Sequence, residues 1–105
     1  MNTIETLFVP YELAVKLKEL GFDEPCLAWY VSEEYGLAYG KVYQSDLIRD
    51  AVVAPTFSQA MIFLYICSNK QIDIELKASD TYEERLRKIT KGCEDLRNLQ
   101  NNKSN

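Results

Sequence analysis

The spacing of apolar and polar residues changes within the second half of the chain, and this change predicts a helix followed by a strand. From Phe57 to Cys67 the residues are apolar on nearly every side of a helix, and Pro55–Thr56 marks its start. Ser68–Lys70 interrupts the run, and Gln71–Leu76 then alternates isoleucine and leucine with aspartate and glutamate, which is typical of a strand with one wet face. A helix that is apolar all round must be covered on more than one side. We therefore expect the rest of the chain to fold around this helix.

The first quarter of the chain predicts a short helix with a defined end. Residues 11–20 carry an apolar face, and Pro10 precedes them at a position where a helix tolerates its missing N–H. Gly21 is a strong stop signal because glycine adopts the left-handed conformation that ends helices. Phe22 is then expected to fold back on Leu17.

Two strands are predicted next. Cys26–Val31 and Leu37–Tyr43 are rich in aromatic and β-branched residues, and the short loop 32–36 makes them an antiparallel hairpin. Gly40 inside the second strand predicts a bulge or a closely approaching backbone. For residues 44–53 the pattern is compatible with a brief helical turn and with an irregular loop.

An acidic first turn opens the last predicted helix, where Asp80 and Glu83 fit a capping box. Apolar positions then recur at steps of four and three, at Tyr82, Leu86, Ile89, Cys93 and Leu96. The polar run 99–105 predicts a flexible tail. These elements predict a single α+β domain over residues 1–98, in which a small, mainly antiparallel three-stranded sheet packs with three helices in the order α-β-β-α-β-α.

Composition argues against several functions. The chain has 105 residues, one domain's worth, with 16 acidic and 12 basic side chains and a net charge of −4. We therefore do not expect a nucleic-acid partner, because phosphate binding depends on clustered lysine and arginine. No histidine is present. The chain thus lacks the commonest general base and transition-metal ligand.

The three cysteines, Cys26, Cys67 and Cys93, are widely spaced and contain no Cys-x-x-Cys pair. This spacing favours buried, inert thiols in a reducing compartment over a zinc or redox site. The N-terminus has no signal-peptide pattern, and no apolar run approaches the roughly 20 residues that cross a bilayer. We expect a cytoplasmic protein without a membrane segment.

Candidate catalytic chemistry is sparse. Carboxylates occur mostly in pairs beside turns, and the pair that would project together from one strand is Asp73 and Glu75. No phosphate-binding, nucleotide-binding, nucleophile-elbow or calcium-loop motif occurs. We therefore predict no catalytic, cofactor-binding or metal-binding residue and no enzyme activity. The alternatives are a small carboxylate-based or metal-dependent enzyme, and a nucleic-acid accessory protein, which needs one exposed stripe of Arg85, Arg87, Lys88 and Lys91.

Aromatic residues crowd the predicted hairpin, and two interpretations of them remain open. They form either a half-buried face of the sheet or a contact surface, since tyrosine and tryptophan are favoured at interfaces. The apolar helix is covered either by the two other helices or by a second copy, most simply in a twofold homodimer. The candidate contact residues are Trp29, Tyr39, Tyr43, Phe57, Met61, Phe63 and Leu64.

Two stretches, Val9–Tyr30 (VPYELAVKLKELGFDEPCLAWY) and Ala54–Leu76 (APTFSQAMIFLYICSNKQIDIEL), resemble a family of short uncharacterised proteins encoded in phages, prophages and mobile elements of gut Bacteroidetes. The string LGFDEPC and the Ala-Pro start of the middle helix are the most specific parts. Members often end that helix with a Trp-Phe-Arg-Glu-Lys type sequence, which Phe63–Cys67 replaces here. The resemblance implies an intracellular mobile-element setting and no established activity. The predicted function is a non-enzymatic phage- or prophage-related accessory protein that self-associates and contacts a phage or host protein.

Overall fold

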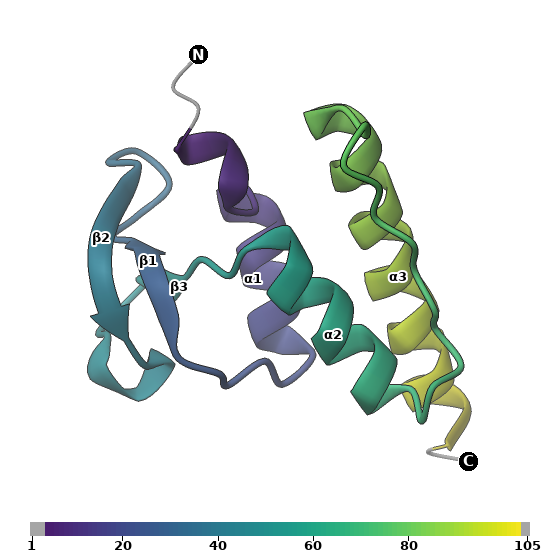
Figure 1. Ribbon diagram of the computed structural model, residues 1–105. Coiled ribbons are helices and arrows are strands. Elements are labelled where there is room, and N and C mark those ends of the chain that lie inside the picture. Colours follow the sequence, from purple (N-terminus) through teal and green to yellow (C-terminus); the bar gives the residue numbers. More distant parts are fainter. Residues whose placement is uncertain (1–3, 104–105) are drawn as a thin grey trace. The chain divides into compact units, whose positions relative to one another are not determined.

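The computed structural model describes residues 4–103, and its internal contacts divide the chain into two compact units between Thr56 and Phe57. Its helices and strands are η1 (Glu5–Leu7), α1 (Tyr11–Glu19), β1 (Cys26–Tyr30), β2 (Leu37–Val42), η2 (Gln44–Asp46), β3 (Val52–Val53), α2 (Phe57–Cys67) and α3 (Tyr82–Lys103) (Figure 1). The three α-helices and the three-stranded antiparallel sheet confirm the predicted α+β class.

Helix α1 ends as its sequence predicts. Gly21 has a φ of +101°, and its N–H donates to the Lys18 carbonyl at 3.0 Å. The Phe22 N–H donates to the Leu17 carbonyl at 2.9 Å, which completes the paired hydrogen bonds of a Schellman end. Phe22 and Leu17 are both buried, so the turn that stops the helix also adds an aromatic ring to the core.

The predicted hairpin is confirmed. Strands β1 and β2 pair antiparallel, and the register shifts between Cys26 and Ala28, as it does at a bulge. Gly40 lies in this part of β2 with a φ of +149°. A Cβ atom there would lie 3.4 Å from the Trp29 ring, so glycine permits both the backbone conformation and the close approach of the ring.

The third strand of the sheet is Val52–Val53, which lies before α2, instead of the predicted Gln71–Leu76. It pairs with β1 on the side opposite β2, and the Ala54 N–H donates to the Ala28 carbonyl at 2.9 Å. Residues 44–53, for which a turn and a loop both remained open, thus contain the short helical turn η2 and this strand.

The free edge of β3 is filled by one side chain. The Val53 N–H, which points away from β1, donates to Gln44 Oε1 at 3.0 Å, and Gln44 Nε2 donates to the Ala51 carbonyl at 3.1 Å. The amide of Gln44 therefore makes the two hydrogen bonds that a further strand would make. An edge blocked in this way is protected against pairing with another chain.

One face of the sheet forms the core of the first unit. Phe8, Ala28 and Ala54 are buried together there, and α1 packs against β3. The Tyr30 hydroxyl donates to the Val9 carbonyl at 2.8 Å, and its ring meets the Tyr11 ring edge-on at 5.6 Å. These contacts bind the N-terminal segment and α1 to the sheet.

Helices α2 and α3 pack side by side in the second unit (Figure 1). Gly92 of α3 lies where they come closest. A Cβ atom at this position would be 2.8 Å from Leu64 Cδ1 on α2 and 2.6 Å from Ile74 Cδ1 on the segment that joins the helices. The helix thus has a glycine in its interior because the neighbouring side chains leave no room for a methyl group.

The joining segment 71–76 is extended but pairs with no strand within residues 4–103. Its side chains alternate as predicted: Ile72 is buried, Ile74 is half-buried, and Asp73 and Glu75 are exposed. The apolar side chains pack against helices instead of completing a sheet, since Ile72 and Ile74 both approach Gly92. The Ile72 N–H donates to Ser68 Oγ at 2.8 Å.

Both ends of α3 differ from the sequence prediction. The capping box is one residue later than predicted: the Glu84 N–H donates to Thr81 Oγ1 at 3.1 Å, and the Thr81 N–H donates to Glu84 Oε1 at 3.2 Å. The helix continues to Lys103, so residues 99–103 are not a tail. Leu99 follows the buried Leu96 by three residues and keeps the apolar side facing inward. Residues 104–105 of the predicted tail lie outside the described residues.

None of the helices described is both long enough and apolar enough to cross a membrane.

Candidate interaction surfaces

Two of the predicted contact residues on α2 are core residues. Leu64 has no exposed surface and lies against Gly92. Phe57 is buried, and its ring meets the Tyr82 ring edge-on with 5.6 Å between the ring centroids. The prediction that these two side chains form an interface is therefore wrong. Met61 and Phe63 are half-buried.

The solvent-exposed side of α2 carries Ile62 and Ile66, which the sequence did not single out. Each lies two residues, or about 200° around the helix, from Leu64. Their side chains are 52% and 67% exposed. The expectation that every broad side of this helix is covered thus needs correction, because one apolar side faces solvent. We call Ile62 and Ile66 the outer side of α2.

The aromatic residues of the hairpin do not share one face. Trp29 pairs with Ala38, whereas Tyr39 pairs with Ala28 on the core face of the sheet. The ring centroids of Tyr39 and Phe8 lie 6.0 Å apart. Tyr39 is nevertheless 50% exposed. The interpretation of these aromatic residues as a half-buried face of the sheet therefore fits only some of them.

Tyr43 lies just after β2 and is 43% exposed, with the Lys41 ammonium 6.0 Å above its ring. Leu27 is an exposed neighbour of Trp29, two residues away on the same face of β1. Trp29 itself is half-buried, with its ring over Gly40. This face thus offers a smaller apolar surface than the four tyrosines and one tryptophan of residues 26–43 suggest.

The four cations that a nucleic-acid surface would need do not form one stripe. Lys88 Nζ donates to Asp80 Oδ2 at 2.7 Å and to the Glu75 carbonyl at 2.8 Å. Arg85 Nη2 donates to the Lys77 and Ala78 carbonyls, each at 3.4 Å. Two of the four cations thus hold the joining segment against α3.

A shallow groove of about 510 Å³ lies between the joining segment and α3. It is lined by Ile74, Glu75, Lys77, Arg87, Lys88 and Lys91. Arg87 and Lys91 are exposed, and Lys91 Nζ makes a surface ion pair with Asp95 at 3.1 Å. We call this feature the basic groove. Sequence reasoning named three of its cations but placed them in a stripe with Arg85 instead of around a groove.

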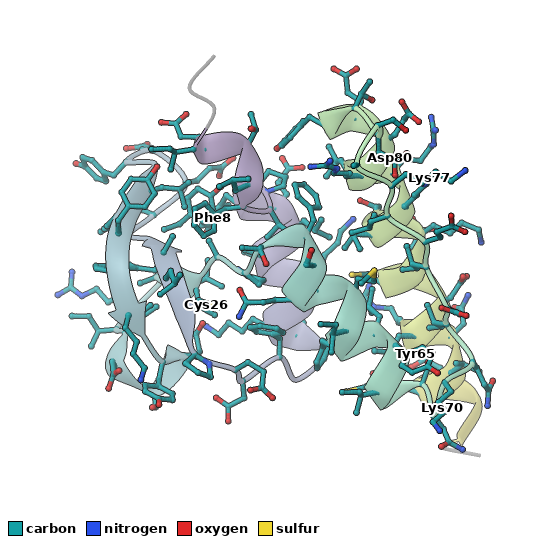
Figure 2. All side chains as sticks on the ribbon, viewed as in Figure 1. Phe8, Cys26, Tyr65, Lys70, Lys77 and Asp80 are labelled. Carbon is teal, nitrogen blue, oxygen red and sulfur yellow. The ribbon has the colours of Figure 1, made fainter. Side chains whose placement is uncertain are left out.

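Asp80 lies at the end of the joining segment that leads into α3, and its hydrogen bonds hold this end in place (Figure 2). Its carboxylate accepts from Lys88 Nζ and from the Lys77 N–H at 2.9 Å. The hydrogen bond from Lys88 is the main cause that lowers the pKa of Asp80, and the backbone hydrogen bond from Lys77 adds to it. Asp80 is therefore ionised at neutral pH and serves to fix the segment.

We expect Asp80→Asn to lower the urea midpoint of unfolding at pH 7. Because the pKa is lower in the folded state, the ionised carboxylate stabilises the fold above its ordinary pKa of 3.8 and stops doing so as the pH falls through the folded value. The difference between wild type and variant should therefore shrink as the pH is lowered from 7 through and below 3.8, where the carboxylate takes up its proton. Urea titrations across this range at constant ionic strength measure it. Asp73→Asn, on the exposed face of the same segment, is the control, and an equal loss in both variants would contradict this role.

The predicted carboxylate pair does not form a pocket. Asp73 and Glu75 are both exposed on the joining segment. Among residues 4–103, no three cysteine, aspartate or glutamate side chains come together as a metal site would require. No observation in the described part of the chain thus favours the enzyme alternative.

Cys26, Cys67 and Cys93 are all free thiols. Cys26 is buried, and desolvation, followed by the nearby Glu24 carboxylate, raises the pKa of its thiol to about 12. Cys93 is also buried, but Cys67 is exposed at the end of α2, contrary to the expectation of burial. Cys67 is the last residue of α2.

No protein-family model matches the chain, and no curated protein or solved structure was found to match it. The resemblance to short phage and mobile-element proteins therefore stays a prediction from the sequence.

Proposed function

We propose that this chain is a non-enzymatic interaction protein that forms a twofold dimer through the outer side of α2. The observation that carries the proposal is the pair Ile62 and Ile66, one turn apart and more than half exposed on an ordered helix. The resemblance of residues 9–30 and 54–76 supplies the expected setting, an accessory protein of a phage or prophage.

A second copy is the occupant that fits this surface best. Residues 57–67 contain no charged side chain, so two such helices meet without the like-charge repulsion that usually opposes self-pairing. In an antiparallel pair related by a twofold axis, Ile62 of one helix would lie beside Ile66 of the other. Full burial of an isoleucine contributes roughly 1.5–3 kcal/mol, so four half-exposed side chains offer a substantial gain.

The sheet offers no comparable route to association. The Gln44 amide fills the outer edge of β3. The other edge strand, β2, contains the bulge beside Gly40 and carries the exposed Lys41, two features that discourage strand addition. These features support a helix contact over edge-to-edge pairing.

Replacing Ile62 and Ile66 together by glutamate is expected to weaken the dimer at least tenfold. Two glutamates on each helix would meet two on its partner, and their charges would have to be desolvated in the contact. Sedimentation equilibrium of the wild type and of Ile62→Glu/Ile66→Glu measures the dissociation constants. Circular dichroism should show the same helix content, because both positions face solvent in the folded chain.

The control changes two exposed isoleucines elsewhere in the same way. Ile4→Glu/Ile48→Glu alters side chains that are 54% and 75% exposed in the first unit and leaves α2 untouched. It should keep the wild-type dissociation constant. Equal weakening of both double variants would mean that net charge, and not the outer side of α2, controls association, and a monomeric wild type would remove the proposal.

A further inference from the structure

We propose that the basic groove binds an extended acidic peptide segment of a partner protein. This inference is independent of dimer formation through α2, since the groove residues lie on the joining segment and on α3. The carrying observation is a concentration of positive charge in a chain whose net charge is −4. Four cations and one carboxylate line the groove: Lys77, Arg87, Lys88 and Lys91 against Glu75.

The cation at the wall of the groove is held in place. Lys88 is fixed by the Asp80 carboxylate and the Glu75 carbonyl, so its ammonium is positioned before any ligand arrives. Lys91 is paired with Asp95 only at the surface, where such a pair contributes roughly 0–1 kcal/mol and is easily exchanged for another carboxylate. Arg87 is exposed one helical turn before Lys91, and its planar guanidinium can donate two parallel hydrogen bonds to a carboxylate.

The lining also selects the class of ligand. Ile74 supplies an apolar wall, and the aliphatic stems of lysine and arginine add to it. A ligand with alternating acidic and apolar side chains matches both components. A nucleic acid matches them less well, because its row of phosphates offers no apolar side chain to the wall that Ile74 supplies.

The shape of the groove favours a chain over a compact molecule. It is open and bounded on one side by the extended segment, which pairs with no strand within residues 4–103. An extended peptide can follow this segment and place successive carboxylates near Lys77 and then near Arg87 and Lys91.

Fluorescence anisotropy with a labelled peptide of alternating leucine and glutamate tests the inference on the full chain. We expect saturable binding that weakens with salt, and an at least tenfold loss of affinity in Arg87→Glu/Lys91→Glu. The matched control, Lys18→Glu/Lys70→Glu, makes the same change in net charge at exposed lysines outside the groove and should lose less than threefold. Circular dichroism of each variant confirms that the helices are intact.

Two comparison probes complete the experiment. A peptide with lysine in place of glutamate should not bind, and a labelled single-stranded oligonucleotide should bind more weakly than the acidic peptide. Absence of acidic-peptide binding, an equal loss in both double variants, or tighter binding of the oligonucleotide would each overturn the assignment.

Discussion

Leu64→Ala is expected to lower the free energy of unfolding of the second unit by about 3 kcal/mol, within the range of roughly 2–5 kcal/mol typical of such truncations. Leu64 has no exposed surface, and its Cδ1 lies where α2 comes closest to Gly92 of α3. Removing its isopropyl group loses the burial energy and leaves a cavity between two helices that are held at this distance by several other side chains. Urea unfolding followed by far-ultraviolet circular dichroism measures the loss.

Ile66→Ala is the matched control on the same helix. It removes a side chain of the same volume class that is 67% exposed, so the free energy of unfolding of the monomeric fold should change by less than about 1 kcal/mol. The comparison is made at low protein concentration, where dimer formation contributes little. Equal losses at the two positions would contradict the assignment of the core side of α2.

Gly92→Leu is expected to cost at least about 2 kcal/mol in the free energy of unfolding, as overpacked cores do. Its Cβ alone would come within 2.6 Å of Ile74 Cδ1 and 2.8 Å of Leu64 Cδ1, and the remaining atoms of leucine have no space between α2, α3 and the joining segment. The gain in helix propensity, roughly 1 kcal/mol over glycine, offsets only part of this loss.

A graded comparison separates steric conflict from helix propensity. Gly92→Ala should cost less than Gly92→Leu, because the displaced atoms are the ends of flexible side chains and alanine is the best helix former. Glu94→Leu, at an exposed position of the same helix, should change stability by no more than about 0.5 kcal/mol. A stable Gly92→Leu variant would mean that α2 and α3 do not approach each other at Gly92.

The parts of the fold that sequence predicted well are those governed by local chemistry. Gly21 ends α1 because few other residues adopt its left-handed backbone conformation. The hairpin follows from two aromatic and β-branched runs and a short connection, and Gly40 sits at the expected irregularity. Each of these signals is complete within a few residues.

The position of the third strand could not be predicted from any local sequence pattern. Val52–Val53 is only two residues long, too short for alternation to be visible, and its pairing with β1 is a long-range contact. The alternation of Gln71–Leu76 correctly indicated one apolar face. It did not indicate what that face packs against, and helices cover it here.

The candidate surfaces were hard to predict for a related reason. Nearly every side of Phe57–Cys67 is apolar, so periodicity cannot distinguish Leu64 in the core from Ile66 in solvent. Gly92 inside the apolar pattern of α3 was the available signal for the side of α3 on which another helix packs, because an interior glycine in a helix usually reflects close packing. The basic groove was missed because it depends on the path of the joining segment beside α3, which brings Lys77 near Arg87.

The most direct measurement is the mass of the wild-type protein in solution, determined by multi-angle light scattering over a range of concentrations. A dimer through Ile62 and Ile66 predicts a mass approaching twice the 12.1 kDa of one chain as concentration rises. A mass that stays at 12.1 kDa across the whole range would show that the outer side of α2 remains in water, and would contradict the proposed function.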